Sequence, residues 1–135
     1  MLSFDALERA FESARVQSNK YNGRTANEKG QRAEVRCLNA VKEVIADCPW
    51  AYSARLASQK EDSSGIDIVI DSVLGKLYLQ VKSSRYGAFR YRRKRRRAEA
   101  LIIIVFENMH DEKLKRKVHN ALYVLRRRVL QLRHN

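Results

Sequence analysis

The sequence predicts an α/β fold in which a central mixed β-sheet of about four strands is flanked by helices, with an extra N-terminal helix and a basic C-terminal helix. Residues 65–84, GIDIVIDSVLGKLYLQVKSS, contain two alternating apolar runs around a glycine and predict a β-hairpin. Residues 101–106 are apolar at every position, which is typical of a buried strand. A length of 135 residues fits a single domain covering residues 1–135.

The N-terminal segment, residues 2–17, is predicted to be an amphipathic helix that packs through apolar side chains such as Leu7 and Phe11. Residues 18–24 are polar and include asparagine and glycine, so we expect a connector there.

A second helix is expected from Thr25 to about residue 46. Thr25 and Glu28 have the spacing of a capping box, and Pro49 favours a helix end before it. The expected buried stripe comprises Leu38, Val41 and Ile45. Glu34 lies one turn before this stripe on the same helix face, so its carboxylate should reach the polar edge of the hairpin.

In the hairpin, alternation places Asp67 on the face opposite the isoleucines. Two registers bring the apolar faces together: Asp67 opposite Gln80 with a loop over 72–75, or Asp67 opposite Lys82 with a turn at 74–75. Both gather the three polar side chains on one face. A carboxylate, an amide and an ammonium beside an apolar core are costly to desolvate, and a divalent metal with its activated water would compensate them.

The remaining elements follow from composition and spacing. Residues 50–56 are predicted to be the first strand, followed by a polar loop over 57–64. Residues 85–100 are interpreted as a loop leading into a helix, before a central strand over 101–106 that helices cover on both faces. A final helix is expected over about 117–132.

The net charge of +13 is concentrated in the C-terminal part. Residues 1–84 contain 12 basic and 11 acidic side chains, whereas residues 85–135 contain 16 basic and 4 acidic ones. Such a charge favours a polyanionic partner, with nucleic acid ahead of anionic lipid. Without a membrane-length apolar run or a signal-peptide pattern, we expect a soluble, intracellular, cytoplasmic protein, nucleoid-associated if prokaryotic. Cys37 and Cys48 form no CxxC motif and are expected to be reduced thiols.

The expected element order, helix, three strands, helix and strand, resembles the core of the PD-(D/E)XK nuclease superfamily. Three motifs carry the resemblance, namely EKGQRAE at 28–34, SSGIDIVI at 63–70 and LQVKSS at 79–84. They resemble the Holliday junction resolvase-like and restriction endonuclease-like branch, which implies a restriction endonuclease-like core over roughly 28–106. Gln80 stands where most members have Glu or Asp, and this QXK variant resembles that of some type IV restriction endonucleases, which are regarded as active.

The resemblance implies a metal-dependent endonuclease that hydrolyses DNA phosphodiester bonds and is structure-selective, acting as a homodimer on junctions with two symmetric strands. The implied catalytic residues are Glu34, Asp67, Gln80 and Lys82. Glu34, Asp67, Gln80 and the Val81 carbonyl would hold Mg²⁺ or Mn²⁺, and Lys82 would position or activate the attacking water. Because Gln80 brings no negative charge, Asp71 is a further candidate ligand on the face of Asp67.

Basic and hydroxyl side chains near the first and third motifs are expected to bind the nucleic-acid backbone. They are Lys29, Arg32, Ser83, Ser84, Arg85, Arg90, Arg92, Arg93, Lys94, Arg95, Arg96 and Arg97. Tyr86, Phe89 and Tyr91 are interleaved with them and are candidates to stack on an unpaired base or at a branch point.

Two other functions remain open from the sequence. The first is a nuclease-fold module with weak or absent catalysis that binds DNA or RNA through its basic C-terminal half. The second is a basic adaptor on an acidic protein or lipid surface, and the basic run is also compatible with a solvated face, a nuclear-import signal or a disordered segment.

Overall fold

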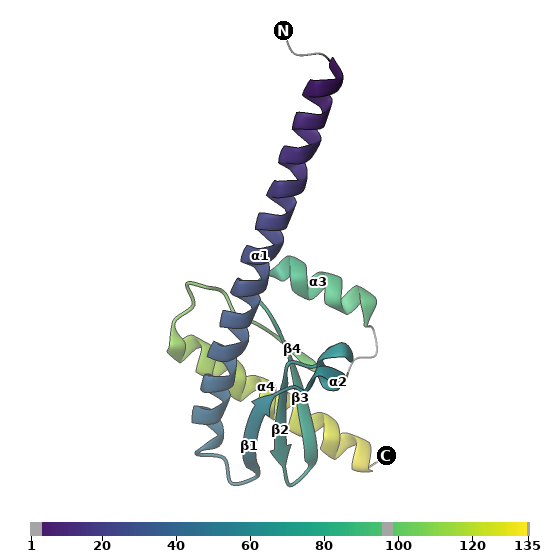
Figure 1. Ribbon diagram of the computed structural model, residues 1–135. Coiled ribbons are helices and arrows are strands. Elements are labelled where there is room, and N and C mark those ends of the chain that lie inside the picture. The colour runs from purple at the N-terminus through teal and green to yellow at the C-terminus, as the bar shows by residue number, and fades with distance from the viewer. Residues whose placement is uncertain (1–3, 96–98, 135) are drawn as a thin grey trace.

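The computed structural model describes residues 4–95 and 99–134 (Figure 1). Along the chain it contains α1 (Phe4–Ile45), β1 (Ala51–Leu56), α2 (Gln59–Ser63), β2 (Ile68–Ser72), β3 (Gly75–Lys82), α3 (Arg85–Lys94), β4 (Leu101–Ile104) and α4 (Asp111–His134). The four strands form one sheet in the order β1-β2-β3-β4, with β1, β2 and β3 antiparallel and β4 parallel to β3. The predicted α/β fold, with a mixed four-stranded sheet flanked by helices, is confirmed at this level.

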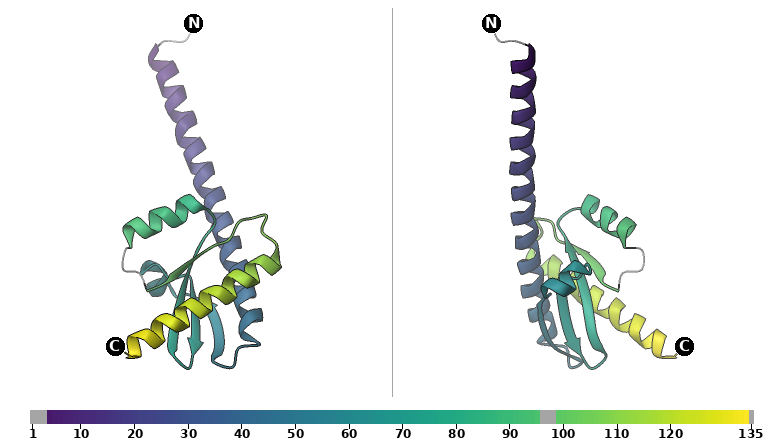
Figure 2. Two further views of the ribbon diagram at one scale, coloured as in Figure 1. Left: turned by 180° about the vertical axis from the view of Figure 1, so that it is seen from behind. Right: turned by 45° about the vertical axis from the view of Figure 1, so that its right-hand side comes forward.

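The hydrophobic core lies between one face of the sheet and the two long helices. Ile68, Ile70 and Leu79 are fully buried in one cluster with Cys37 of α1 and Val118 of α4. Alternation along β2 and β3 puts these strand residues on a single face. Seen from behind in Figure 2, α4 crosses the sheet, while the N-terminal half of α1 projects away from it.

The hairpin has the first of the two expected registers. Ile68 pairs with Leu79 and Asp71 with Lys76, as in the register with the loop over 72–75. The pairing begins at Ile68, and Asp67, directly before it, donates its N–H to the Leu79 carbonyl. Pairing continues to Ser72 and Gly75, so the loop itself is shorter than expected. Gly75 adopts φ +98°, the left-handed conformation that this tight turn requires and that a glycine reaches without strain.

The expected connector over 18–24 is wrong, because α1 runs without interruption through it. No proline occurs within α1, and a glycine inside a helix costs only about 1 kcal/mol relative to alanine. Thr25 therefore lies inside the helix and not at an N-cap. The expected packing of Leu7 and Phe11 falls outside the side chains that the structure describes.

Two expected loops are also corrected. Within 57–64 the chain forms the short helix α2, because Ser58 and Glu61 make a capping box. Over 85–100 the order is reversed: α3 begins directly after β3, since the Ser84 hydroxyl accepts a hydrogen bond from the Gly87 N–H at 3.0 Å. The described residues between α3 and β4, at 95, 99 and 100, are not helical. The strand at 101–106 is shorter and is not central: β4 pairs only with β3 in the described sheet and forms its edge.

The last helix begins earlier than expected, at Asp111, and Leu132 is 76% exposed instead of extending the buried stripe. Both cysteines are free, as predicted, with Cys37 buried and Cys48 partly exposed. Within residues 4–95 and 99–134, no helix combines the length and the apolar character that a membrane span requires.

Candidate active site

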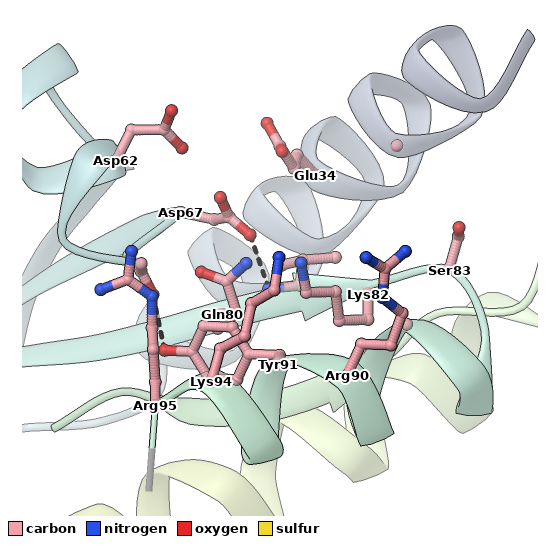
Figure 3. A pocket seen from close by; sticks show the side chains of 14 residues that line it. Glu34, Asp62, Asp67, Gln80, Lys82, Ser83, Arg90, Tyr91, Lys94 and Arg95 are labelled. Atoms are coloured by element: carbon pink, nitrogen blue, oxygen red, sulfur yellow. Dashed lines mark hydrogen bonds between the residues drawn. The ribbon is translucent and has the colours of Figure 1, made fainter. Parts of the chain in front are cut away.

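A cleft of about 550 Å³ opens at the end of the sheet where β2 begins and β3 ends (Figure 3). Four of the residues expected to act together line it, namely Glu34, Asp67, Gln80 and Lys82. Val81 and Ser83 also border it, and α3 contributes Gly87, Arg90, Tyr91 and Lys94. The hairpin register and the middle of α1 therefore bring together side chains that are distant in sequence.

Asp67 is held by the backbone of the neighbouring strand. Its Oδ2 accepts a hydrogen bond from the Val81 N–H at 2.8 Å, and its own N–H donates to the Leu79 carbonyl at 2.9 Å. The side chain is only 6% exposed, so few water molecules can solvate its charge. This arrangement fixes one carboxylate oxygen and leaves the other directed into the cleft.

Gln80 lies on β3, borders the same cleft as Asp67 and is equally buried, at 6% exposure. Its Oε1 has no hydrogen-bond partner. An unpaired buried oxygen of this kind carries an uncompensated desolvation cost of about 1–3 kcal/mol. The atom is therefore available to a ligand in the cleft.

Three carboxylates converge at the mouth of the cleft, with Glu34 and Asp62 on either side of Asp67 (Figure 3). Burial, followed by the charges of Asp67 and Asp62, raises the pKa of Glu34 from 4.5 to about 7. Burial and the Asp62 charge raise the pKa of Asp67 from 3.8 to about 6, against the opposing effect of the Val81 hydrogen bond. The three carboxylates therefore carry more negative charge than the neighbouring cation, Lys82, offsets.

That cation is Lys82, whose charge lowers the pKa of both Glu34 and Asp67. Its Nζ lies 5.4 Å from the centroid of the Tyr91 ring. The aromatic ring shields one side of the ammonium, and attraction between a cation and a ring face favours this position. Lys82 therefore lines the same cleft as the carboxylates.

The segment from α2 to the start of β2, which carries Asp62 and Asp67, is held against α3 by contacts that the sequence did not predict. The Tyr91 hydroxyl donates to the Gly65 carbonyl at 2.8 Å, and Arg95 Nη2 donates to the Ser63 carbonyl at 2.9 Å. Gly65 has φ +84°, and a Cβ there would lie 2.7 Å from the Arg95 side chain. Only glycine satisfies both the conformation and the close approach.

Asp62 was also missed, although its sequence position five residues before Asp67, next to the capping box of α2, was a usable signal. It borders both the main cleft and a second cleft of about 460 Å³ that shares Gly30, Glu34 and Asp67. The carboxylates accordingly separate two adjoining clefts.

The cleft offers oxygen donors to a divalent cation. Among the residues that the structure describes, no group of three or more histidine, cysteine or carboxylate side chains has an arrangement that could hold a metal ion. The donors in this cleft do not form such a group, because one of them is an amide oxygen: Asp67 and Glu34 are combined with the unpartnered oxygen of Gln80. Hard oxygen donors and an excess of negative charge fit Mg²⁺ or Mn²⁺.

The expected backbone-binding residues divide into groups. Arg90, Lys94 and Arg95 line the cleft with Ser83, and Figure 3 shows the cationic ends of Arg90 and Lys94 on the side of Lys82. Arg85, Arg92 and Arg93 are exposed on α3, and Lys29 lies partly exposed on α1. Arg96 and Arg97 lie outside the described residues.

Two expectations about individual residues are corrected, Asp71 as a ligand and Tyr91 as a stacking ring, and Arg32 lies away from the cleft. Arg32 forms an ion pair with Glu107 at 2.6 Å and does not line the cleft. Asp71 is at the hairpin end of β2, where the Ser53 hydroxyl donates to it at 3.2 Å, so it is remote from the cleft because four residues of extended strand separate it from Asp67. Tyr91 is 7% exposed and faces inward, so it offers no free ring face to a base.

No protein-family model matches the sequence, and the chain has no significant match among curated proteins or solved structures.

Proposed function

We propose that this protein is a metal-dependent endonuclease that hydrolyses DNA phosphodiester bonds, built on a restriction endonuclease-like core. The observation that carries the proposal is the cleft lined by buried Asp67, directly before β2, and buried Gln80 of β3, together with Glu34 and Lys82. These are the positions that the PD-(D/E)XK resemblance assigns to catalysis, with Gln80 as the QXK variant of the third motif.

Glu34, Asp67 and the Gln80 amide oxygen would hold Mg²⁺ or Mn²⁺, and the Val81 carbonyl is the fourth donor that the resemblance implies. When bound, the metal supplies Lewis-acid chemistry: it lowers the pKa of water and stabilises the negative charge that develops on phosphate oxygens. Asp67 stays in place because the Val81 N–H holds one of its oxygens. The raised pKa values of Glu34 and Asp67 fit a site whose charge balance is completed by a cation.

Lys82 is the proposed positioning group for the nucleophile. Its ammonium lies beside the carboxylates and against the Tyr91 ring, where it can hold a water molecule and offset charge in the transition state. Arg90 and Lys94 border the same cleft and would bind the phosphates on either side of the bond that is cut. Contacts of this kind align the backbone without reading sequence.

The substrate that we propose is branched DNA, in a recombination or repair reaction, with the protein acting as a homodimer. This rests on the resemblance to junction resolvases and on the concentration of basic residues after Lys82. The second candidate is a DNA- or RNA-binding module without efficient catalysis. One observation favours it: Gln80 offers a neutral oxygen, whereas a carboxylate at this position of β3 would strengthen metal binding.

The test is cleavage of labelled four-way junction, flap, linear duplex and single-stranded DNA with Mg²⁺, Mn²⁺ or EDTA. We expect metal-dependent cutting that Asp67→Ala and Lys82→Ala abolish. Asp71→Ala and Lys76→Ala are matched controls, because these residues pair with each other at the hairpin end outside the cleft and should retain activity.

Calorimetric titration with Mg²⁺ separates the two functions. Tight DNA binding by the wild type without cutting, and without measurable metal binding, would refute the nuclease and support the binding module. Cutting that persists in Asp67→Ala would show that the chemistry resides elsewhere.

A further inference from the structure

The outer face of α3 exposes two large aromatic side chains. Tyr86 is 69% exposed and Phe89 is 55% exposed. They stand three residues apart and therefore lie on one side of the helix, whereas Ala88 and Tyr91 are buried on the opposite side. An aromatic ring in such a position gives the fold less stability than a buried ring would, because more than half of each residue's surface stays in water.

Both rings are accompanied by arginines from the next helical turn. The Arg90 guanidinium lies 5.8 Å from the Tyr86 ring centroid, and the Arg93 guanidinium lies 5.8 Å from the Phe89 ring centroid. Half of the ten residues of α3 are basic and none is acidic. The stripe formed by Tyr86, Phe89, Arg90 and Arg93, hereafter the aromatic–arginine stripe, thus alternates ring faces with positive charges.

The stripe is continuous with the proposed active site. Arg90 belongs to both, because it borders the cleft and also lies over the Tyr86 ring. Lys94, one turn further along the helix, borders the cleft as well. A strand whose phosphate occupies the cleft would therefore meet the stripe with the nucleotides next to the cutting position.

We propose that the aromatic–arginine stripe of α3 binds unpaired DNA bases that flank the cleft, with Tyr86 and Phe89 stacking on bases and Arg90 and Arg93 holding the adjoining phosphates. This inference deepens the proposed function and rests on it for the position of the scissile phosphate. Charge complementarity selects this occupant: an apolar protein segment would not match the cationic stripe, and paired bases have no free faces to stack. The site recognises an unpaired segment through shape and stacking and is indifferent to its sequence.

The test measures binding in EDTA, so that it does not depend on catalysis. The probes are a fully paired duplex and the same duplex with a short single-stranded extension that carries 2-aminopurine, whose fluorescence is quenched by stacking. We expect the wild type to prefer the extended duplex and to quench the probe. Tyr86→Ala/Phe89→Ala should remove this preference, with a loss of about 5- to 150-fold for each stacked base, and should abolish quenching.

Matched variants distinguish stacking from charge and from folding. Tyr86→Phe keeps a ring and should bind like the wild type, whereas Tyr123→Ala removes a tyrosine that is 56% exposed on α4 and should change nothing. Because the double aromatic variant removes no charge, it should leave the dependence of log affinity on log salt unchanged. Arg93→Ala, which removes an exposed guanidinium that the proposal places on a phosphate, should reduce that slope by about one unit.

An unchanged preference and unchanged quenching in the double aromatic variant would overturn the stacking site, even if the wild type cuts DNA. An equal loss of affinity for paired and extended duplexes would overturn it as well. Conversely, a wild type that shows the preference but never cuts would refute the nuclease and retain the stacking site.

Discussion

Replacing Asp67 with asparagine should stabilise the metal-free protein at pH 8. The carboxylate is buried, and its pKa in the folded state is raised from 3.8 to about 6. Ionising an acid whose pKa is raised in the folded state lowers the free energy of unfolding. For Asp67 this loss is absent below pH 3.8, because the carboxyl is then protonated in both states. It develops between pH 3.8 and about 6 and is complete above that. The asparagine side chain of the variant would carry no charge and would show no such dependence.

The magnitude follows from the pKa shift. A rise from 3.8 to about 6 corresponds to about 3 kcal/mol. The raised pKa already includes the opposing effect of the Val81 hydrogen bond, and the asparagine oxygen can still accept that N–H. The expected gain at pH 8 is therefore about 3 kcal/mol, or a rise of about 10 °C in Tm for a chain of this size.

The assay is thermal denaturation of Asp67→Asn and wild type in EDTA at pH 4 and pH 8, followed by Mg²⁺ titration at pH 8. The two proteins should converge at pH 4 and separate at pH 8, and Mg²⁺ should raise the Tm of the wild type alone. Because the charge of Asp67 raises the pKa of Glu34, that pKa should also fall in the variant. A variant less stable than the wild type at pH 8, with an equal response to Mg²⁺, would refute the reasoning.

Three further predictions concern single positions. Gln80→Glu should lower the Tm of the metal-free protein at pH 8, because it adds a buried charge to the carboxylate cluster, but should reduce the Mg²⁺ concentration needed for half-maximal thermal stabilisation. Gly65→Ala should destabilise the fold by about 2 kcal/mol in urea denaturation, because a left-handed φ opposes a Cβ and the Arg95 side chain would have to move and give up its hydrogen bond to the Ser63 carbonyl. Gly75→Ala has only the conformational penalty, since its surroundings are open, and should cost about 1 kcal/mol. In the native protein at pH 8, a thiol reagent should modify Cys48 but not Cys37, whose pKa burial raises to about 12.

Each of these has an informative contrary result. A Gln80→Glu protein with unchanged Mg²⁺ dependence would place the metal away from β3. Equal losses for the two glycine substitutions would show that the contact between Gly65 and Arg95 is unimportant. Rapid modification of both cysteines, as expected only after unfolding in urea, would show that the core around Cys37 opens readily.

The hairpin and its polar group were predictable because strand geometry is local. Alternation fixes which side chains share a face, and the observed register, in which Ile68 pairs with Leu79, is one of only two arrangements that bury the apolar face. Glu34 was predictable for a similar reason, since a residue one turn before a buried stripe shares its helix face. The capping box of α2 was equally local and was overlooked in a loop rich in polar residues.

The sequence by itself determined the four-stranded α/β architecture, the central carboxylate, amide and lysine group, and the concentration of positive charge after Lys82. Only the tertiary structure decided that β4 forms an edge, that Asp62 joins the carboxylates, and that Arg95 packs against Gly65. It also decided that, among neighbouring aromatics of α3, Tyr91 is buried while Tyr86 is exposed. The reason is physical: periodicity specifies directions within one element, whereas contacts between elements depend on how the packed core orients them.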